Sequence, residues 1–331
     1  MSIYEAYCIQ LNRVVSITEA RTEFLNLYPC KRFQFLCSTE SCRIKGVKIT
    51  GINYDHFPDE IKQSPHFKYL SKNNIAHSAD CQWNQTKIEP IAGESDEEYN
   101  LRKVRSKLHD FIDEFQLPED DIGLQSEVTN SLSTTSQSKV NKIISNQHNQ
   151  AKRRYIKTNQ LIRLVEAYLD AKKNLSEKEF LNLPLKVANS NIRYLYQYFR
   201  RTEKAIQRKQ KCVCIAEVEY TETDKWLYFK LQKPFKENEN SPEIPIYLGI
   251  KKIDLENYHY RRILYAHIES NKYKNKYFKI YFIPQEKDFN IKKMKNKDGK
   301  EIELYFFEIN NLNLFCLFNY NYLRKKKQSV L

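Results

Sequence analysis

Four potential metal ligands occur as two closely spaced pairs in the first part of this chain. Cys37 and Cys42 are separated by four residues, and His77 and Cys81 are separated by three. Zinc in structural sites takes four nitrogen or sulfur ligands in a tetrahedron, and two such pairs supply them. Two turns bound to one ion also restrict the path of the chain between them. We therefore predict that Cys37, Cys42, His77 and Cys81 bind a structural Zn²⁺ with no open coordination position.

Two other residues compete for these ligand roles. His66 lies in Pro65-His66-Phe67, between the two pairs, and Cys30 precedes the first pair. The 34 residues between the pairs exceed what a compact zinc finger holds, so part of this segment has to loop out. The sequence leaves the choice between His66 and His77 open. Without a metal, the four side chains would be ordinary core residues.

The N-terminus and the cysteine pattern suggest a reducing compartment. Residues 1–10 contain no basic segment, so we expect no signal peptide. No run of about 18 apolar residues occurs, which argues against a membrane span. We therefore expect a cytoplasmic protein in which clustered cysteines bind metal rather than form disulfides. The remaining cysteines are predicted to be buried thiols without a chemical role: Cys8, Cys30, Cys212, Cys214 and Cys316.

Composition limits the class of protein further. Hydrophobic residues make up 41% of the 331 residues, which is enough for packed cores in two or three domains. Only 6 residues are glycine, so glycine-rich phosphate-binding loops are absent. The net charge is +14, which favours polyanionic partners, nucleic acid above all. No nucleophile motif of a known hydrolase class appears, and the sequence gives no positive support for an enzyme.

The distribution of charge and residue types predicts four segments of an α+β protein. Residues 1–90 form the zinc-knuckle module. Residues 91–150 contain an acidic helix over Asp96–Phe115, followed by a flexible linker rich in Ser, Thr, Asn and Gln. Residues 151–211 hold 16 Lys and Arg against 5 Asp and Glu and form a basic helical domain. Residues 212–331 form a β-rich barrel or sandwich.

Local patterns predict individual elements within these segments. Capping boxes at Ser16–Glu19 and Ser176–Glu179 begin two short helices. Helical spacing predicts one helix from about residue 161 and a long second one over residues 188–209. Runs of β-branched and aromatic residues predict the following strands of the last segment: 215–220, 226–231, 245–250, 277–283, 301–307 and 314–318.

Basic residues interleaved with tyrosine predict a nucleic-acid-binding surface. Such residues neutralise phosphates and stack on bases, but they do not read sequence. The runs Tyr273–Lys279 and Tyr322–Lys327 have this composition. Seven residues of the basic segment are the primary candidates, three of them consecutive and four on one stripe of the predicted long helix: Lys152, Arg153, Arg154, Arg193, Arg200, Lys204 and Arg208.

The first quarter of the chain resembles the N-terminal module of the bacterial competence-protein (CoiA-like) family. The resemblance covers residues 5–81 and rests on Val15–Ala20, Phe35-Leu-Cys37 with Cys42, and Pro65-His66-Phe67 followed by His77. The spacing between the cysteines is four residues rather than two, and the distance from His66 to the next histidine is longer. The resemblance implies a zinc-stabilised module in a DNA-linked protein. The nuclease domain of that family has no recognisable counterpart, because the sequence offers no convincing Asp followed at moderate distance by Glu-x-Lys on a strand.

Together these features predict a zinc-stabilised nucleic-acid-binding protein, a non-catalytic component of a bacterial DNA-handling or defence assembly. DNA is favoured over RNA as the partner, and no membrane partner is expected. Two alternatives stay open: a nuclease with an unrecognised metal-dependent site, and an adaptor whose aromatic β-domain binds another protein.

Overall fold

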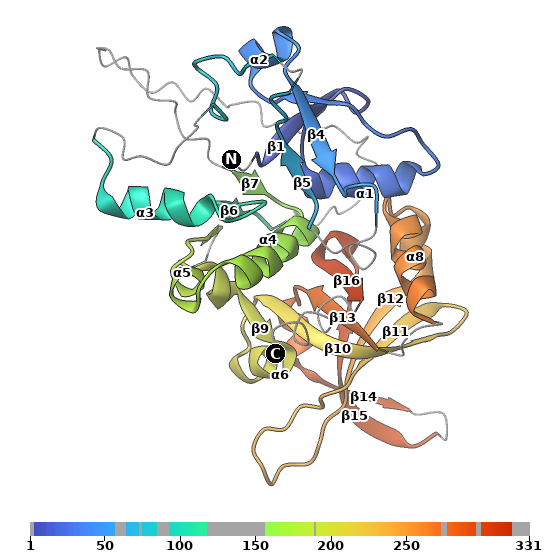
Figure 1. Ribbon diagram of the computed structural model, residues 1–331. Helices are drawn as coiled ribbons and strands as arrows, with labels where there is room; N and C mark the ends of the chain where they lie inside the picture. The colour runs from blue at the N-terminus through green and yellow to red at the C-terminus, as the bar shows by residue number, and fades with distance from the viewer. Residues whose placement is uncertain are drawn as a thin grey trace, which may run out of the picture.

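The structure is a computed structural model with helices and sheets in an α+β arrangement (Figure 1). It describes residues 3–56, 64–72, 75–84, 93–117, 156–188, 190–272, 277–295 and 299–319. The predicted linker and the basic residues Lys152, Arg153 and Arg154 lie outside these residues, as does the run Tyr322–Lys327. Within the described residues, no helix is both long and apolar enough to cross a membrane.

The N-terminal part forms an antiparallel five-stranded sheet in the order β2-β1-β3-β4-β5. The strands are β1 (Glu5–Cys8), β2 (Arg13–Ser16), β3 (Phe35–Cys37), β4 (Lys48–Ile52) and β5 (His66–Lys68). Helix α1 (Ile17–Leu27) follows β2 directly, and the short helix α2 (Glu40–Ile44) follows β3. The predicted capping box is confirmed, because the Ser16 hydroxyl accepts a hydrogen bond from the Glu19 amide and the Glu19 carboxylate accepts one from the Ser16 amide.

The predicted helix over Asp96–Phe115 is wrong in its second half. Helix α3 spans Asp96–Arg105, and Glu114–Phe115 is a strand, β6. β6 pairs in parallel with β7 (Lys157–Thr158) and β8 (Lys186–Val187). The apolar residues between α3 and β6 are buried, and they enter the core from an irregular segment. Pairing with two strands distant in sequence outweighs the local helical periodicity.

The predicted long helix over residues 188–209 is also wrong. The segment contains a 3₁₀ turn (Leu195–Tyr198), strand β9 (Phe199–Arg201) and helix α6 (Thr202–Arg208). β9 pairs in parallel with the start of β10 (Val213–Glu222), which extends the main sheet. Tyr198 and Phe199 are almost fully buried. The sheet pairing and the burial of these aromatic side chains explain why the chain leaves the helical path.

The C-terminal part forms an eight-stranded sheet in the order β14-β15-β12-β11-β10-β13-β16, with β9 beside β10. Beyond β9 and β10, its strands are β11 (Trp226–Leu231), β12 (Ile246–Lys251), β13 (Tyr277–Phe282), β14 (Ile291–Lys295), β15 (Glu301–Glu308) and β16 (Phe315–Asn319). The predicted strands of this region are confirmed, and β14 is additional. Among the residues that the structure describes, the sheet ends at β14 on one side and at β16 on the other and does not close, so the barrel alternative is wrong.

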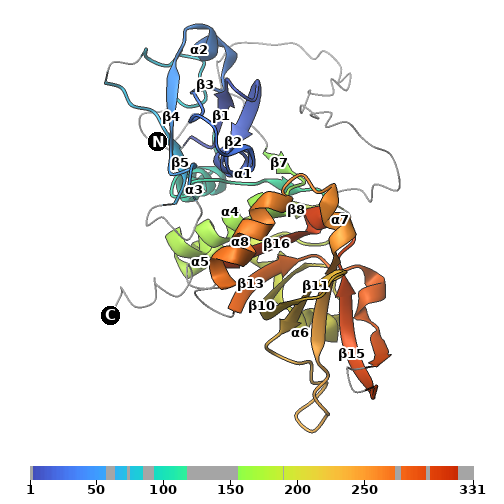
Figure 2. The ribbon, with the colours of Figure 1, turned by 90° about the vertical axis from the view of Figure 1, so that its right-hand side faces the viewer.

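Helices cover one side of this sheet (Figure 2). Helix α4 (Leu161–Asn174) and helix α8 (Arg261–Lys272) both contact β16, while α5 (Glu177–Leu181) and α7 (Lys252–Glu256) are single short turns at the periphery. A continuous hydrophobic cluster runs from Leu108 to Phe318 and unites these helices with the sheet. A second cluster, from Ile3 to Trp83, forms the core of the N-terminal part. The predicted boundary after residue 211 falls inside the larger cluster.

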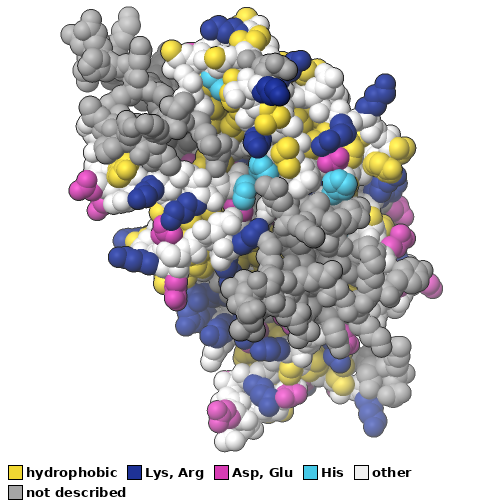
Figure 3. Space-filling view, viewed as in Figure 1, with side chains coloured by type: hydrophobic (Ala, Val, Ile, Leu, Met, Phe, Trp, Pro, Cys, Tyr) yellow, Lys and Arg dark blue, Asp and Glu magenta, His cyan; other side chains and the backbone are white. Residues whose placement is uncertain are grey.

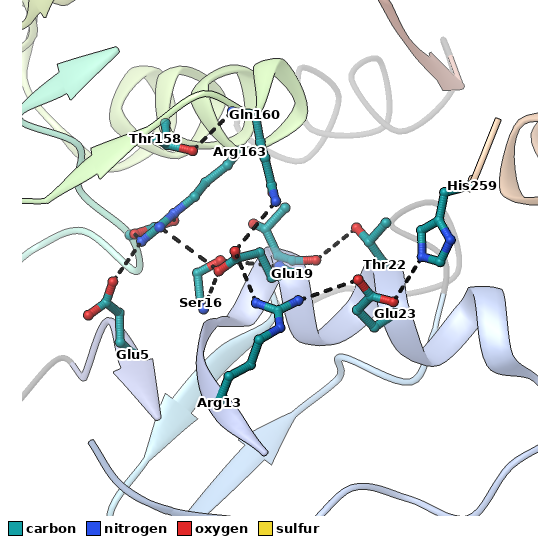
Figure 4. Close-up of polar contacts among 12 residues, drawn as sticks. Glu5, Arg13, Ser16, Glu19, Thr22, Glu23, Thr158, Gln160, Arg163 and His259 are labelled. Atoms are coloured by element: carbon teal, nitrogen blue, oxygen red, sulfur yellow. Dashed lines mark hydrogen bonds and ion pairs between the residues drawn. The ribbon is translucent and has the colours of Figure 1, made fainter. Parts of the chain in front are cut away.

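The two parts meet through a network of charged side chains (Figure 4). Arg163 of α4 is almost fully buried; its Nε lies 2.9 Å from an Asp110 carboxylate oxygen and its Nη2 lies 3.6 Å from Glu5 of β1. Arg21 of α1 forms an ion pair with Glu166 of α4. Two residues further along α1, Glu23 contacts His259 at 3.3 Å. Charged groups from the N-terminal sheet, α1 and α4 thus neutralise one another at this contact.

Candidate metal centre

The four predicted zinc ligands come together from two loops at one end of the N-terminal sheet. Cys37 is the last residue of β3, and Cys42 lies in α2, so one short turn carries both thiols. His77 and Cys81 lie in the loop after β5. The ligand atoms of all four residues lie within 4.8 Å of one another.

Two of the distances between these atoms match those around a tetrahedral ion, and a third is shorter. With zinc–sulfur bonds of about 2.3 Å and zinc–nitrogen bonds of about 2.0–2.1 Å, neighbouring ligand atoms are about 3.5–3.8 Å apart. The Cys37 and Cys81 sulfurs are 3.6 Å apart, and the Cys42 sulfur lies 3.6 Å from His77 Nδ1. The Cys81 sulfur lies 3.2 Å from the same nitrogen. The four donors therefore surround a volume of the size that one such ion needs.

Hydrogen bonds fix the positions of the two loops around the Cys₃His group. The Ser78 amide donates to the Cys42 sulfur at 3.2 Å, and the Trp83 amide donates to the Cys81 sulfur at 3.4 Å. The Trp83 indole N–H donates to the Ser38 hydroxyl at 2.8 Å and ties the second loop to the first. Amide donors to sulfur stabilise the thiolate form, which is the form that binds metal.

Burial controls the protonation of the group. It raises the pKa of the Cys37 thiol to about 12, and the adjacent Cys81 sulfur acts in the same direction. Burial also lowers the pKa of His77, which keeps the imidazole neutral with a lone pair for a metal. Three buried thiolates are stable together only when a cation compensates their charge. The donor set therefore fits a thiophilic divalent cation.

His66 and Cys30, the competing ligands, lie outside the group. His66 Nδ1 lies 2.9 Å from the Ser64 carbonyl oxygen, and its ring packs against His109. The Cys30 thiol lies 3.8 Å from the Phe24 carbonyl oxygen and is half-buried. Cys8, Cys212, Cys214 and Cys316 are buried in the two cores.

The predicted basic stripe does not form, because its helix does not exist. Arg193 is exposed in a loop, and Arg200 lies in β9, where its Nε donates to the Gln210 side chain at 2.6 Å. Lys204 and Arg208 are exposed on α6, four residues apart. The structure therefore separates the four residues between a loop, a strand and a helix.

A different set of cations gathers near the end of α4. Burial lowers the pKa of Lys279 in β13, and the positive charges of Lys172 in α4 and Arg201 in β9 lower it further, against the opposing effect of Glu217. We call Lys172, Arg201 and Lys279 the basic cluster. Lys and Arg side chains are also visible around α5, β9 and α6 at the lower left of Figure 3. The sequence contained no signal for the cluster beyond the presence of Lys279 in a basic run, since the three residues are far apart along the chain.

Comparisons with protein-family models, with curated proteins and with solved structures found no match for this chain. The functional argument therefore depends on the geometry of the described residues.

Proposed function

We propose that Cys37, Cys42, His77 and Cys81 bind one Zn²⁺ as a structural ion. The supporting observation is the convergence of three sulfurs and one imidazole nitrogen within 4.8 Å of one another. Three thiolates and one histidine are a common ligand set of closed structural zinc sites, and with all four positions taken by protein no position is open for a catalytic water. The ion would join the turn after β3 to the loop after β5 and so stabilise the N-terminal core.

Elemental analysis of the purified chain tests the zinc assignment. We expect one tightly bound zinc per chain after extensive dialysis, lost in Cys37→Ser and in Cys81→Ser, because either change removes a thiolate from the group. The His66→Gln variant is the matched control and should keep its zinc. Zinc-free protein with native stability, or loss of zinc in His66→Gln with retention in His77→Gln, would contradict the assignment.

We further propose that the protein binds nucleic acid, DNA in preference to RNA, as a non-catalytic component of a DNA-handling or defence assembly. The observation that carries this proposal is the basic cluster. Burial lowers the pKa of Lys279, and the charges of Lys172 and Arg201 act in the same direction, while Glu217, opposite Lys279 in the β10–β13 register, acts against them. Bound phosphates would stabilise the charged form of this lysine. The net charge of +14 adds a long-range attraction for polyanions. Lys204 and Arg208 on α6 would extend the same positively charged surface.

The salt dependence of DNA binding tests this proposal. We expect the logarithm of affinity to fall linearly with the logarithm of salt concentration, as measured by fluorescence anisotropy on labelled duplex and single strands. Replacing Lys172, Arg201 and Lys279 by Gln should reduce the slope by about 2–3, since each phosphate contact contributes about 0.7–0.9.

A matched triple variant controls for the loss of net charge. Lys225, Lys236 and Lys293 are exposed and outside the basic cluster, so their replacement by Gln should leave most of the slope intact. Equal reductions of the slope in the two triple variants would show that binding depends on net charge alone. That result would refute the basic cluster as the interface. Cleavage of the DNA in the presence of Mg²⁺ would instead favour a nuclease.

A further inference from the structure

Two histidines from separate parts of the fold meet beside the charged contact between the two cores. His66 belongs to β5 of the N-terminal sheet, and His109 lies in the irregular segment after α3. Their ring centroids are 5.3 Å apart, with an angle of 48° between the ring planes. Neither residue belongs to the Cys₃His group.

In both rings, the Nδ1 atom is held by an oxygen acceptor. His109 Nδ1 lies 2.8 Å from one carboxylate oxygen of Asp170, and the His109 amide donates to the other oxygen at 2.7 Å. Asp170 is itself held by the Asn174 side-chain amide at 2.8 Å. His66 Nδ1 lies 2.9 Å from the carbonyl oxygen of Ser64. A carbonyl oxygen accepts only, so His66 must carry its proton on Nδ1, and the Asp170 carboxylate selects the same tautomer in His109.

This tautomer leaves the lone pair on Nε2 in both rings. Among the described residues, neither Nε2 atom has a hydrogen-bond partner. A histidine that binds metal through one nitrogen typically donates its other N–H to a carboxylate or a backbone carbonyl. Asp170 and Ser64 are acceptors of these two kinds.

The separation of the rings also agrees with a shared ion. With a metal–nitrogen bond of about 2.0–2.1 Å, an imidazole centroid lies about 3.2 Å from the metal, so two imidazoles on one ion have centroids about 4.5–5.2 Å apart. The observed 5.3 Å lies just above this range, so a small rotation of the rings would bring them to it. Both side chains are partly exposed, which gives an ion access from solvent.

We propose that His66 and His109 bind a divalent transition-metal cation through their Nε2 atoms, with water completing its coordination. Imidazole nitrogen suits zinc, nickel and copper ions, and with only two protein ligands this site would be weaker than the Cys₃His site. Asp170 is a positioning residue, which holds the ring of His109 and its tautomer. Because β5 and the segment after α3 belong to different cores, the ion would link the two parts of the molecule.

Calorimetric titration of the zinc-loaded full chain with Zn²⁺ tests the proposal. We expect a second, weaker equivalent that is lost in His66→Gln and in His109→Gln, while the first zinc is retained in both. Asp170→Asn should keep the stoichiometry and weaken the second equivalent about 10–100-fold, as is usual for a partner of a metal-bound histidine. His56→Gln removes another exposed histidine and is the control, with no change expected.

The outcomes separate this site from the Cys₃His site. Absence of a second equivalent in the wild-type protein would overturn the proposal, as would a second equivalent that survives in both His66→Gln and His109→Gln. A first equivalent that stays intact in these variants shows that they are folded, so loss of the second alone supports the shared site. If the purified protein does not hold zinc at the Cys₃His group, the structural zinc site is refuted. The site of His66 and His109 is then tested separately, by whether added Zn²⁺ binds and whether that binding is lost in the two histidine variants.

Discussion

At the scale of the residue, Arg163 is a buried cation with several carboxylate partners. Its side chain is 5% exposed, and its partner Asp110 is 6% exposed. Glu5 and Glu19 approach the same guanidinium at 3.6 and 4.0 Å. One buried cation therefore compensates carboxylates from β1, from α1 and from the segment after α3. Arginine suits this role because its planar guanidinium donates to several carboxylates at once.

Replacing Arg163 by methionine should destabilise the protein by about 3–5 kcal/mol, because buried Asp110 would lose its counter-charge. Urea unfolding followed by circular dichroism measures this change. Arg193→Met, at an exposed arginine in a loop, is the control and should change the stability by no more than about 0.5 kcal/mol. If the double replacement Arg163→Met with Asp110→Leu were as unstable as Arg163→Met alone, the ion pair would not be the cause.

At the scale of the element, aromatic side chains pack closely over a glycine of the eight-stranded sheet. Gly249 lies in β12, and a Cβ atom there would lie 2.5 Å from the Phe306 ring and 3.2 Å from Trp226. Phe306, Trp226 and Tyr228 pack against one another over this position. The aromatic side chains of the two neighbouring strands, β11 and β15, thus occupy the space that a side chain of β12 would need.

The Gly249→Ala variant should lose about 1–3 kcal/mol of stability, since overpacking forces the rings from their positions. Thermal unfolding of the variant measures the loss. Gly249→Ala combined with Phe306→Leu should recover part of it, because the smaller side chain makes room for the methyl group. Unchanged stability in the single variant would show that the rings adjust without cost.

At the scale of the whole molecule, the two hydrophobic cores differ in their dependence on metal. The N-terminal core, from Ile3 to Trp83, includes three of the proposed zinc ligands, whereas the cluster from Leu108 to Phe318 includes none of them. A structural ion contributes its binding free energy to the folding of the part that it binds. Removal of the metal should therefore affect the two parts unequally.

Chelation of zinc should increase amide hydrogen exchange in β3, α2 and the loop containing His77 and Cys81, and leave β10, β11 and β13 protected. Hydrogen-exchange mass spectrometry of the full chain before and after chelator treatment makes the comparison. Re-addition of zinc should restore protection in the first group. An equal increase in both groups would show that the two cores unfold as one unit.

The two pairs of candidate metal ligands and several local elements could be predicted from the sequence, because they depend on neighbours along the chain. The two ligand pairs were recognisable by spacing, and the Ser16–Glu19 capping box needs only a turn of helix to form. The strands of the last segment were visible as aromatic and β-branched runs, which suit a pleated, buried surface.

Tertiary structure decided the features that depend on residues distant in sequence. Spacing could not choose between His66 and His77, because the choice depends on how the loop after β5 returns to β3. Helical periodicity failed at Phe115 and Phe199, where pairing with distant strands outweighed local preference. The basic cluster, the Arg163 network and the pair of His66 and His109 likewise each join separate segments. Such contacts arise only when the whole chain packs, since burial and electrostatic interaction act through space.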